Sequence, residues 1–266
     1  MKRNLLKNIF LSLCLVVFPM GMAAKQEATV TSPSGNLALT AGVDKAGRPY
    51  YSLSRGKEAI LLPSYLGVKL KDGSLDSDFG VMGFVRATKD ETWHQPWGEE
   101  NDVRNHYNEL TMKLAQRKGL KRQLTIVFRV FDDGMGFRYV FPEQKNLKHF
   151  VIMDEETEFC FKGDPEAWTL PYDADYYEGL WTKAPLSKKQ KVCTPITIEA
   201  KPDLYMMLHE ANLTDYASLN VKPVETKEGN VRMRAELVPW SNGDLVRAKA
   251  PDRKSTRLNS SHSAKS

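Results

Sequence analysis

The feature that most constrains the fold is an alternation of apolar and polar residues with a period of two, which recurs along most of the chain. Successive side chains of a β-strand point to opposite faces, so this pattern predicts strands with one face in a core. The stretches that show it are NLALTAGV, PYYSLS, YLGVKL, HYNELTMKLAQ, QLTIVFRVF, GFRYVF, PITIEA, DLYMMLHEA and VRMRAELV. No segment has the period and both end caps of an amphipathic helix. The sequence therefore predicts an all-β fold, a large antiparallel β-sandwich.

Turn signals separate many of these stretches, among them Asp72-Gly73, Glu228-Gly229 and Asn242-Gly243. In FRVFDDGMGFRYVF, two alternating runs flank Asp132-Asp133-Gly134, which predicts a β-hairpin. The chain shows no repeat of fixed period, and this disfavours a propeller or a solenoid.

The first 24 residues have the layout of a secretory signal peptide. Lys2, Arg3 and Lys7 precede the apolar run IFLSLCLVVF, and GMAA then offers small residues for cleavage. The apolar run is too short to span a bilayer comfortably, and no later segment is long enough for a membrane helix. We therefore expect an exported protein, periplasmic or associated with the outer membrane, without a membrane span.

The last fifteen residues, DRKSTRLNSSHSAKS, are polar, basic and rich in serine. Such a composition cannot bury apolar surface, so residues 252–266 are expected to be a disordered tail. A second interpretation is foreign sequence, such as a vector scar. Residues 25–251 then form one large domain.

Charge and cysteine content exclude some classes of function. The formal net charge of +5 falls to −1 for residues 25–251, because residues 1–24 carry +3 and residues 252–266 carry +3. The basicity of the chain thus lies in its ends, and we expect no nucleic-acid partner. Beyond the signal region the cysteines are Cys160 and Cys193. Export permits a disulfide between them, and two free thiols are an equal alternative.

The sequence TWHQPWGEENDVRNHYNE, residues 92–109, is dense in polar and aromatic side chains. Glu99 and Glu100 look like a carboxylate pair, and glycoside hydrolysis needs two carboxyl groups about 5–9.5 Å apart. Adjacent residues on a strand point to opposite faces, so this pair suits that chemistry poorly. A solvated acidic loop is an equally good interpretation. Zinc-ligand spacings, phosphate-binding loops and a nucleophilic-serine motif are all missing from the sequence.

Two further stretches could bind a ligand. TLPYDADYYEGLWT, residues 169–182, interleaves acidic residues with Tyr and Trp. Carboxylate oxygens at short spacing suit calcium, and flat aromatic faces can pack on a sugar ring. In YMMLHEANLTDY, His209 and Glu210 follow the end of an alternating run, where a strand can present polar groups to a site. An exposed acidic loop and a structural histidine are the alternatives.

Five segments occur in the order found in the N-terminal domain of glycoside hydrolase family 97, which the chain resembles from about Val30 to about Pro251. They are SPSGNLALTAGVDKAGRPYYSL, TWHQPWGEENDVRNHYNEL, VFRVFDDGMGFRYVFPEQ, LPYDADYYEGLW and LHEANLTDY. The family comprises Bacteroides-type exported α-glucosidases and α-galactosidases that depend on calcium. The resemblance implies an N-terminal β-super-sandwich, a (β/α)₈ catalytic barrel and a C-terminal β-domain.

The resemblance also implies roles for particular residues. The family's N-terminal domain lends one glutamate to the calcium ion, and the matching position is Glu178. His209 and Glu210 match a motif expected near the barrel, and with Trp97 and Trp181 they are the substrate-binding candidates. Trp97 is expected to shape a loop or a domain interface. No catalytic residue is expected in this chain, because the family's catalytic carboxylates lie in the barrel.

After AKAP the family pattern leads to the barrel, whereas this sequence continues with DRKSTRLNSSHSAKS. The sequence therefore predicts a chain truncated before its catalytic domain, inactive by itself, whose partners are the missing barrel and an α-linked oligosaccharide. A stand-alone carbohydrate-binding module and a structural partner of a separate barrel chain are the alternatives.

Overall fold

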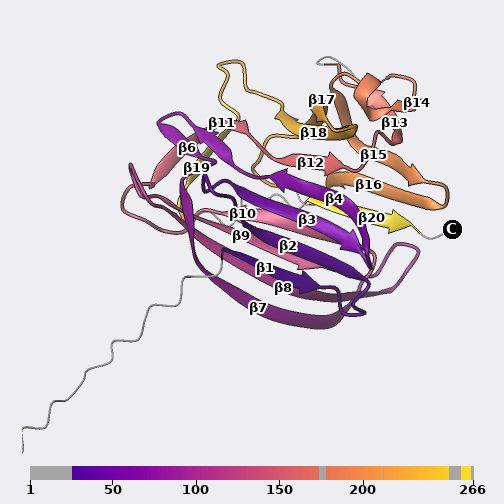
Figure 1. Cartoon of the computed structure of the whole chain (residues 1–266), viewed down its shortest axis with the longest axis horizontal. Helices are drawn as coiled ribbons and strands as arrows, with labels where there is room; N and C mark the ends of the chain where they lie inside the picture. The colour runs from indigo at the N-terminus through magenta and orange to yellow at the C-terminus, as the bar shows by residue number, and fades with distance from the viewer. Residues whose placement is uncertain (1–25, 174–177, 212, 252–258, 265–266) are drawn as a thin grey trace, which may run out of the picture.

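The computed structural model describes residues 26–173, 178–211, 213–251 and 259–264. Within them the chain forms twenty β-strands and a single 3₁₀ turn, η1 (Leu186–Lys188), so the predicted all-β class is confirmed (Figure 1). No helix in these residues is long and apolar enough to cross a membrane.

The strands of the first half are β1 (Glu27–Thr31), β2 (Leu37–Val43), β3 (Pro49–Arg55), β4 (Glu58–Tyr65), β5 (Val68–Leu70), β6 (Gly73–Leu75), β7 (Phe79–His94), β8 (Asp102–Gln116), β9 (Gln123–Val130) and β10 (Gly134–Val140). The second half contributes β11 (His149–Glu155), β12 (Glu158–Phe161), β13 (Glu166–Pro171), β14 (Thr182–Pro185), β15 (Val192–Lys201), β16 (Leu204–Glu210), β17 (Leu219–Lys227), β18 (Asn230–Leu237), β19 (Val246–Lys249) and β20 (Asn259–Ala264).

Most strands belong to one large antiparallel sheet, with the order β1-β2-β3-β4-β12-β18-β17-β15-β16-β20-β10-β9-β8-β7 and with β13 and β14 attached to β15. The sheet folds over on itself, so that β1–β4 lie across β7–β10 (Figure 1). Aromatic contacts join the two layers: the Tyr51 ring on β3 lies 6.1 Å from Phe128 on β9 and 5.4 Å from Phe137 on β10. The alternating apolar residues therefore meet between the layers, as a sandwich requires.

A second sheet, with the order β19-β11-β5-β6, packs at one end of the large one. The predicted hairpin is confirmed as β9 and β10, which are joined at Asp132-Asp133 and paired from Val130 with Met135. Cys160 on β12 and Cys193 on β15 are buried and free, which decides between the two cysteine alternatives.

The two ends of the chain can be compared with what the sequence predicted for them. The predicted signal peptide, residues 1–24, lies outside the described residues. The expectation of a disordered tail differs from the structure at Asn259–Ala264, which form β20 between β10 and β16. Main-chain hydrogen bonds pair such a strand without any apolar side chain, which is why composition did not predict it. The division into residues 1–24, 25–251 and 252–266 stays a prediction.

Candidate functional site

Glu178, the predicted calcium ligand, lies in the connection between β13 and β14. Its side chain is exposed, as are those of Leu180 and Trp181, which are 86% and 54% accessible. Within the described part of the chain no hydrogen bond or ion pair holds the Glu178 carboxylate. Asp175, Tyr176 and Tyr177, which the sequence placed in the same acidic aromatic loop, lie outside the described residues. The connection thus presents one carboxylate and two large apolar side chains to solvent.

The two ends of this connection are well anchored. The Tyr172 amide donates to the Lys191 carbonyl at 3.1 Å, and the Lys191 ammonium lies 3.6 Å from the centre of the Tyr172 ring. Gly179 approaches β13 so closely that a Cβ atom there would lie 2.9 Å from Leu170 Cδ1. These contacts fix the segment on either side of Glu178 against β13 and β15.

His209 and Glu210 lie at the end of β16, as the sequence predicted, and both are half-buried. His209 Nδ1 lies 2.9 Å from the carbonyl of Glu210, and Glu210 Oε1 accepts a hydrogen bond from the Leu219 amide at 2.6 Å. The Glu210 carboxylate therefore ties the end of β16 to the start of β17. One of the two carboxylate oxygens of Glu210 therefore serves the fold by binding a main-chain amide.

The strand register places these two predicted groups at the same end of the sheet. The last residue of β13, Pro171, pairs with Val192 at the start of β15, and Leu208 near the end of β16 pairs with Ile196. The connection carrying Glu178 and the pair His209–Glu210 therefore both leave the sheet at the end where β15 begins. On the same strands the rings of Trp168 and Tyr205 lie 6.1 Å apart.

Trp97 is 79% exposed in the turn between β7 and β8. These two strands form the far end of the large sheet's strand order, away from β13–β16. The structure therefore does not bring Trp97 together with Glu178, His209 or Trp181 through strand pairing. Glu99 and Glu100 are also exposed in this turn.

The polar block around this turn is organised by cross-strand pairs. Arg104 donates two hydrogen bonds to Asp90, at 2.8 and 2.7 Å, and Asn105 donates one to Glu91 at 2.9 Å. The Arg104 guanidinium holds the pKa of the Asp90 carboxyl below its usual value. Because Arg104 pairs with Asp90 and Lys89 pairs with Glu91, these charges are neutralised within the exposed hairpin, which agrees with the interpretation as a solvated loop.

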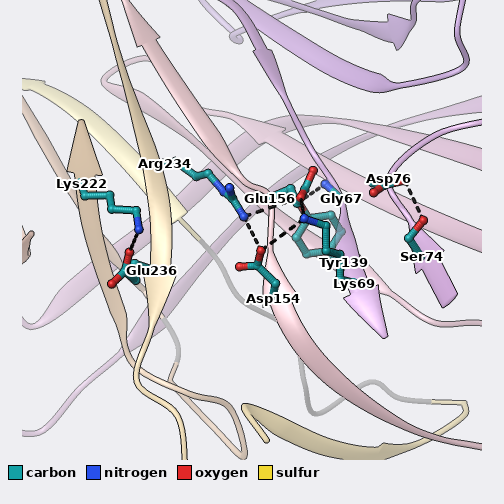
Figure 2. Close-up of polar contacts among 10 residues, drawn as sticks. All are labelled: Gly67, Lys69, Ser74, Asp76, Tyr139, Asp154, Glu156, Lys222, Arg234 and Glu236. Atoms are coloured by element: carbon teal, nitrogen blue, oxygen red, sulfur yellow. Dashed lines mark hydrogen bonds and ion pairs between the residues drawn. The ribbon is translucent and has the colours of Figure 1, made fainter. Parts of the chain in front are cut away.

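Sequence reasoning missed a polar cluster where the small sheet meets the large one (Figure 2). Lys69 on β5 and Arg234 on β18 each approach both Asp154 and Glu156; the Lys69–Glu156 and Arg234–Asp154 contacts are the short ones, and the other two measure 3.6 Å. The hydrogen bond with Glu156 raises the pKa of the Lys69 ammonium. Four charges of both signs cancel here, so the cluster joins the sheets and leaves no charge for a ligand. The sequence MDEETE marked it only as an acidic run.

Next to this cluster, the Tyr139 hydroxyl accepts a hydrogen bond from the Gly67 amide at 3.0 Å and lies 2.8 Å from the Thr157 hydroxyl. Figure 2 shows Tyr139 and Gly67 beside the charged groups, with the Ser74–Asp76 and Lys222–Glu236 contacts to either side. These bonds hold the chain as it passes between the two sheets.

The sequence also did not indicate a groove of about 580 Å³ at the free edge of β1. Hydroxyl, amide and charged groups line it, from Thr29, Thr31, Arg86, Thr88, Asn108 and Glu109. The Asn108 amide donates to the Thr31 carbonyl at 2.9 Å, and Arg129 binds Glu109 at 3.0 Å. Among the described residues, none that lines this groove is aromatic, so they offer no flat surface on which a sugar ring packs.

A metal site cannot be assembled from the described residues alone, because no three His, Cys, Asp or Glu side chains there are arranged to hold an ion. Calcium takes six to eight oxygen ligands. The exposed Glu178 carboxylate fits the chemistry of one such ligand and leaves the others to be supplied from elsewhere.

Several known glycosidases are similar to this chain in sequence. A retaining α-galactosidase of Bacteroides thetaiotaomicron is 28% identical over 250 residues, which is 88% of this chain and 35% of that protein. A probable retaining α-galactosidase of Streptomyces bingchenggensis is 26% identical over 184 residues, 68% of this chain and 28% of its own length. The chain thus spans about a third of the length of these relatives.

Among solved structures, a glycoside hydrolase family 97 enzyme from Pseudoalteromonas sp. strain K8, in complex with acarbose, superposes with a TM-score of 0.80 at 29% identity. The match covers 89% of this chain and 35% of that one. A β-arabinopyranosidase at 22% identity, with a TM-score of 0.79, shares the fold. The family model for the glycosyl-hydrolase 97 N-terminal region matches residues 30–242. The chain belongs to the glycosyl-hydrolase 97 N-terminal family.

Proposed function

We propose that this chain is the N-terminal β-sandwich of an exported, calcium-dependent α-glycosidase, and that it packs on a catalytic barrel and provides Glu178 as one calcium ligand. The observation that carries the proposal is the exposed Glu178 carboxylate, which two anchored strands hold out beside Leu180 and Trp181. The matched relatives are about three times as long and are named as galactosidases, which supports a hydrolase built from more than this region.

The sandwich would serve the enzyme in two ways. Leu180 and Trp181 are large apolar side chains that gain stability when another domain covers them. Glu178 would then bring a negative charge to the interface, where carboxylates suit a hard cation. Bound calcium would supply charge stabilisation and help to orient the substrate. His209 and Glu210, at the same end of the sheet, would contact the α-linked oligosaccharide or the barrel.

A genomic test addresses the proposal directly. We expect the gene of this protein to encode a catalytic barrel in the same reading frame as the sandwich. A gene that encodes the sandwich without a barrel would contradict the proposal and leave the binding-module alternative.

In the longer protein, Glu178→Gln should raise the calcium concentration needed for half-maximal hydrolysis of nitrophenyl α-galactoside or α-glucoside by at least tenfold. Glu99→Gln is the matched control, because Glu99 is an equally exposed glutamate on the distant β7–β8 turn. An unchanged calcium requirement in Glu178→Gln would refute the ligand role without touching the family assignment.

The exposed Trp181 and Leu180 also favour a second candidate, a carbohydrate-binding module without catalysis. Titration of the chain with maltooligosaccharides separates the two. Saturable binding that Trp181→Ala removes, measured without any barrel, would favour the module.

A further inference from the structure

The short connection between η1 and β15, residues 189–191, starts from a fixed position. Leu186 in η1 is fully buried, and its amide donates to the Pro165 carbonyl at 3.0 Å. Ser187 donates its amide and its hydroxyl to the Asp164 carboxylate, at 2.9 and 2.5 Å. The side chains that follow η1 therefore extend from an anchored main chain, beside the paired strands β13, β14 and β15 (Figure 1).

Lys189, the first residue after η1, reaches one end of the connection that carries Glu178. Its ammonium donates to the carbonyl and to the hydroxyl of Thr182, at 2.8 and 3.2 Å. The Lys189 side chain is half-buried, and burial lowers the pKa of its ammonium. Hydrogen bonds from a charged donor are stronger than those from a neutral one, so Lys189 fixes the residue that directly follows Trp181.

Lys191 reaches the opposite end of the same connection. Its ammonium lies 3.6 Å from the centre of the Tyr172 ring and 3.3 Å from Glu236 Oε1. Its carbonyl accepts a hydrogen bond from the Tyr172 amide at 3.1 Å. A cation over an aromatic face and a main-chain hydrogen bond thus act on one residue, and together they tie Tyr172 to the start of β15.

Two lysines from one short connection therefore hold both ends of another. Between those ends Glu178 is exposed, and Gly179 packs closely on Leu170 of β13. Within the described residues no hydrogen bond or ion pair holds the Glu178 carboxylate itself. Its position consequently depends on how the main chain on either side of it is fixed.

We propose that Lys189 and Lys191 are positioning residues, which clamp the two ends of the β13–β14 connection and so preset the place of the Glu178 carboxylate. The inference rests on the proposed role of Glu178 as a calcium ligand and adds the residues through which the sandwich presents that ligand. An ammonium group has no acceptor, so neither lysine is itself a calcium ligand. A carboxylate on a fixed main chain loses less conformational freedom when an ion binds, so the clamp lowers the calcium concentration that the enzyme needs.

Proteolysis of this chain tests the clamp without calcium. Lys189→Met and Lys191→Met each remove the charge from a long side chain. In both variants a glutamate-specific protease should cleave after Glu178 at least about threefold faster, because cleavage of a folded protein follows local opening of the main chain. Cleavage after Glu99 in the distant β7–β8 turn, followed in the same samples by mass spectrometry, is the internal reference and should stay unchanged.

Calcium dependence in the longer protein tests the positioning role. Lys189→Met and Lys191→Met should raise the calcium concentration for half-maximal hydrolysis by about three- to tenfold and leave kcat at saturating calcium unchanged. A general loss of structure would lower kcat at every calcium concentration instead. Lys191→Arg should stay close to wild type, since a guanidinium also stacks on an aromatic ring.

The matched control is Lys188→Met, since Lys188 is an exposed lysine of η1 that makes no hydrogen bond or ion pair within the described residues. It should leave both readouts at wild-type values. Wild-type cleavage after Glu178 in the Lys189 and Lys191 variants would overturn the clamp. Faster cleavage with an unchanged calcium requirement, where Glu178→Gln does raise that requirement, would overturn the positioning role. If Glu178→Gln leaves the requirement unchanged, the ligand role fails, and the cleavage rates still decide whether the two lysines form a clamp.

Discussion

Tyr51 connects the two layers of the sandwich through a single side chain. Its ring is fully buried between Phe128 and Phe137, and its hydroxyl donates to the Glu158 carbonyl at 3.0 Å. Burial raises the pKa of this hydroxyl well above its ordinary value, so it stays protonated and able to donate. One residue of β3 thus reaches β9, β10 and the start of β12.

Replacement of Tyr51 by Phe should lower the free energy of unfolding by about 1 kcal/mol, because the Glu158 carbonyl loses its buried donor while the ring contacts remain. Urea denaturation followed by fluorescence measures the change. Tyr50→Phe is the matched control on the same strand, since the Tyr50 hydroxyl binds Glu27 at the surface. A Tyr50→Phe loss as large as that of Tyr51→Phe would contradict the layer-joining role.

The Arg122–Asp72 pair gives a dependence of stability on pH. Arg122 is 4% exposed and donates to both Asp72 oxygens, at 3.0 and 2.5 Å, which lowers the pKa of the Asp72 carboxyl. A lowered folded-state pKa contributes stability above the unfolded value of about 3.9, and this stability is lost as the pH falls through the folded-state pKa.

Wild type should therefore be more stable than Asp72→Asn at pH 7, and the difference should shrink as the pH drops below about 4. Chemical denaturation at a series of pH values measures it. A difference that stays constant from pH 7 to pH 2 would show that the pair does not titrate as described.

The β7–β8 hairpin has two parts with different environments. Near its base, Leu110 and Met112 are fully buried in the sandwich, whereas residues 86–94 of β7 are exposed on both faces. The cross-strand Arg104–Asp90 pair and its neighbours hold this outer part as a solvated ribbon. The hairpin is thus anchored at one end and free to contact another surface at the other.

Leu110→Ala should destabilise the protein by about 2–5 kcal/mol, because it leaves a cavity between β8 and β9. Val85→Ala, at a half-exposed position of the same hairpin, should change stability by less than about 0.5 kcal/mol. Urea midpoints of the two variants provide the comparison. Similar losses in both would show that the outer ribbon is part of the cooperative core.

The strands that were predicted from sequence are those with one buried face. NLALTAGV became β2, QLTIVFRVF became β9 and VRMRAELV became β18, since alternation records a half-buried strand directly. The outer ribbon of β7 was not recognised, because a strand exposed on both faces has no apolar period. The candidate site could be predicted only in part. The sequence placed His209 and Glu210 at a strand end, but only the strand pairing, which the sequence pattern does not give, brings the Glu178 connection to the same end of the sheet.

The molecule as a whole is a single folded-over sheet with a small second sheet at one end, and this architecture decides where the candidate site lies. The Glu178 connection and the His209–Glu210 pair share one end of β13–β16, while the charged cluster of Lys69, Asp154, Glu156 and Arg234 fixes the small sheet to the large one. In the proposed function, such a body would offer a surface to another domain and the Glu178 carboxylate to a cation.

The purified chain, incubated with calcium and with nitrophenyl α-galactoside or α-glucoside, tests the central claim that this sandwich is the non-catalytic part of a family 97 glycosidase. Released nitrophenol is measured by absorbance against a buffer blank. The account predicts no turnover above the blank with either substrate. Clear turnover that Glu178→Ala abolishes would contradict it, because a catalytic site would then lie within this domain.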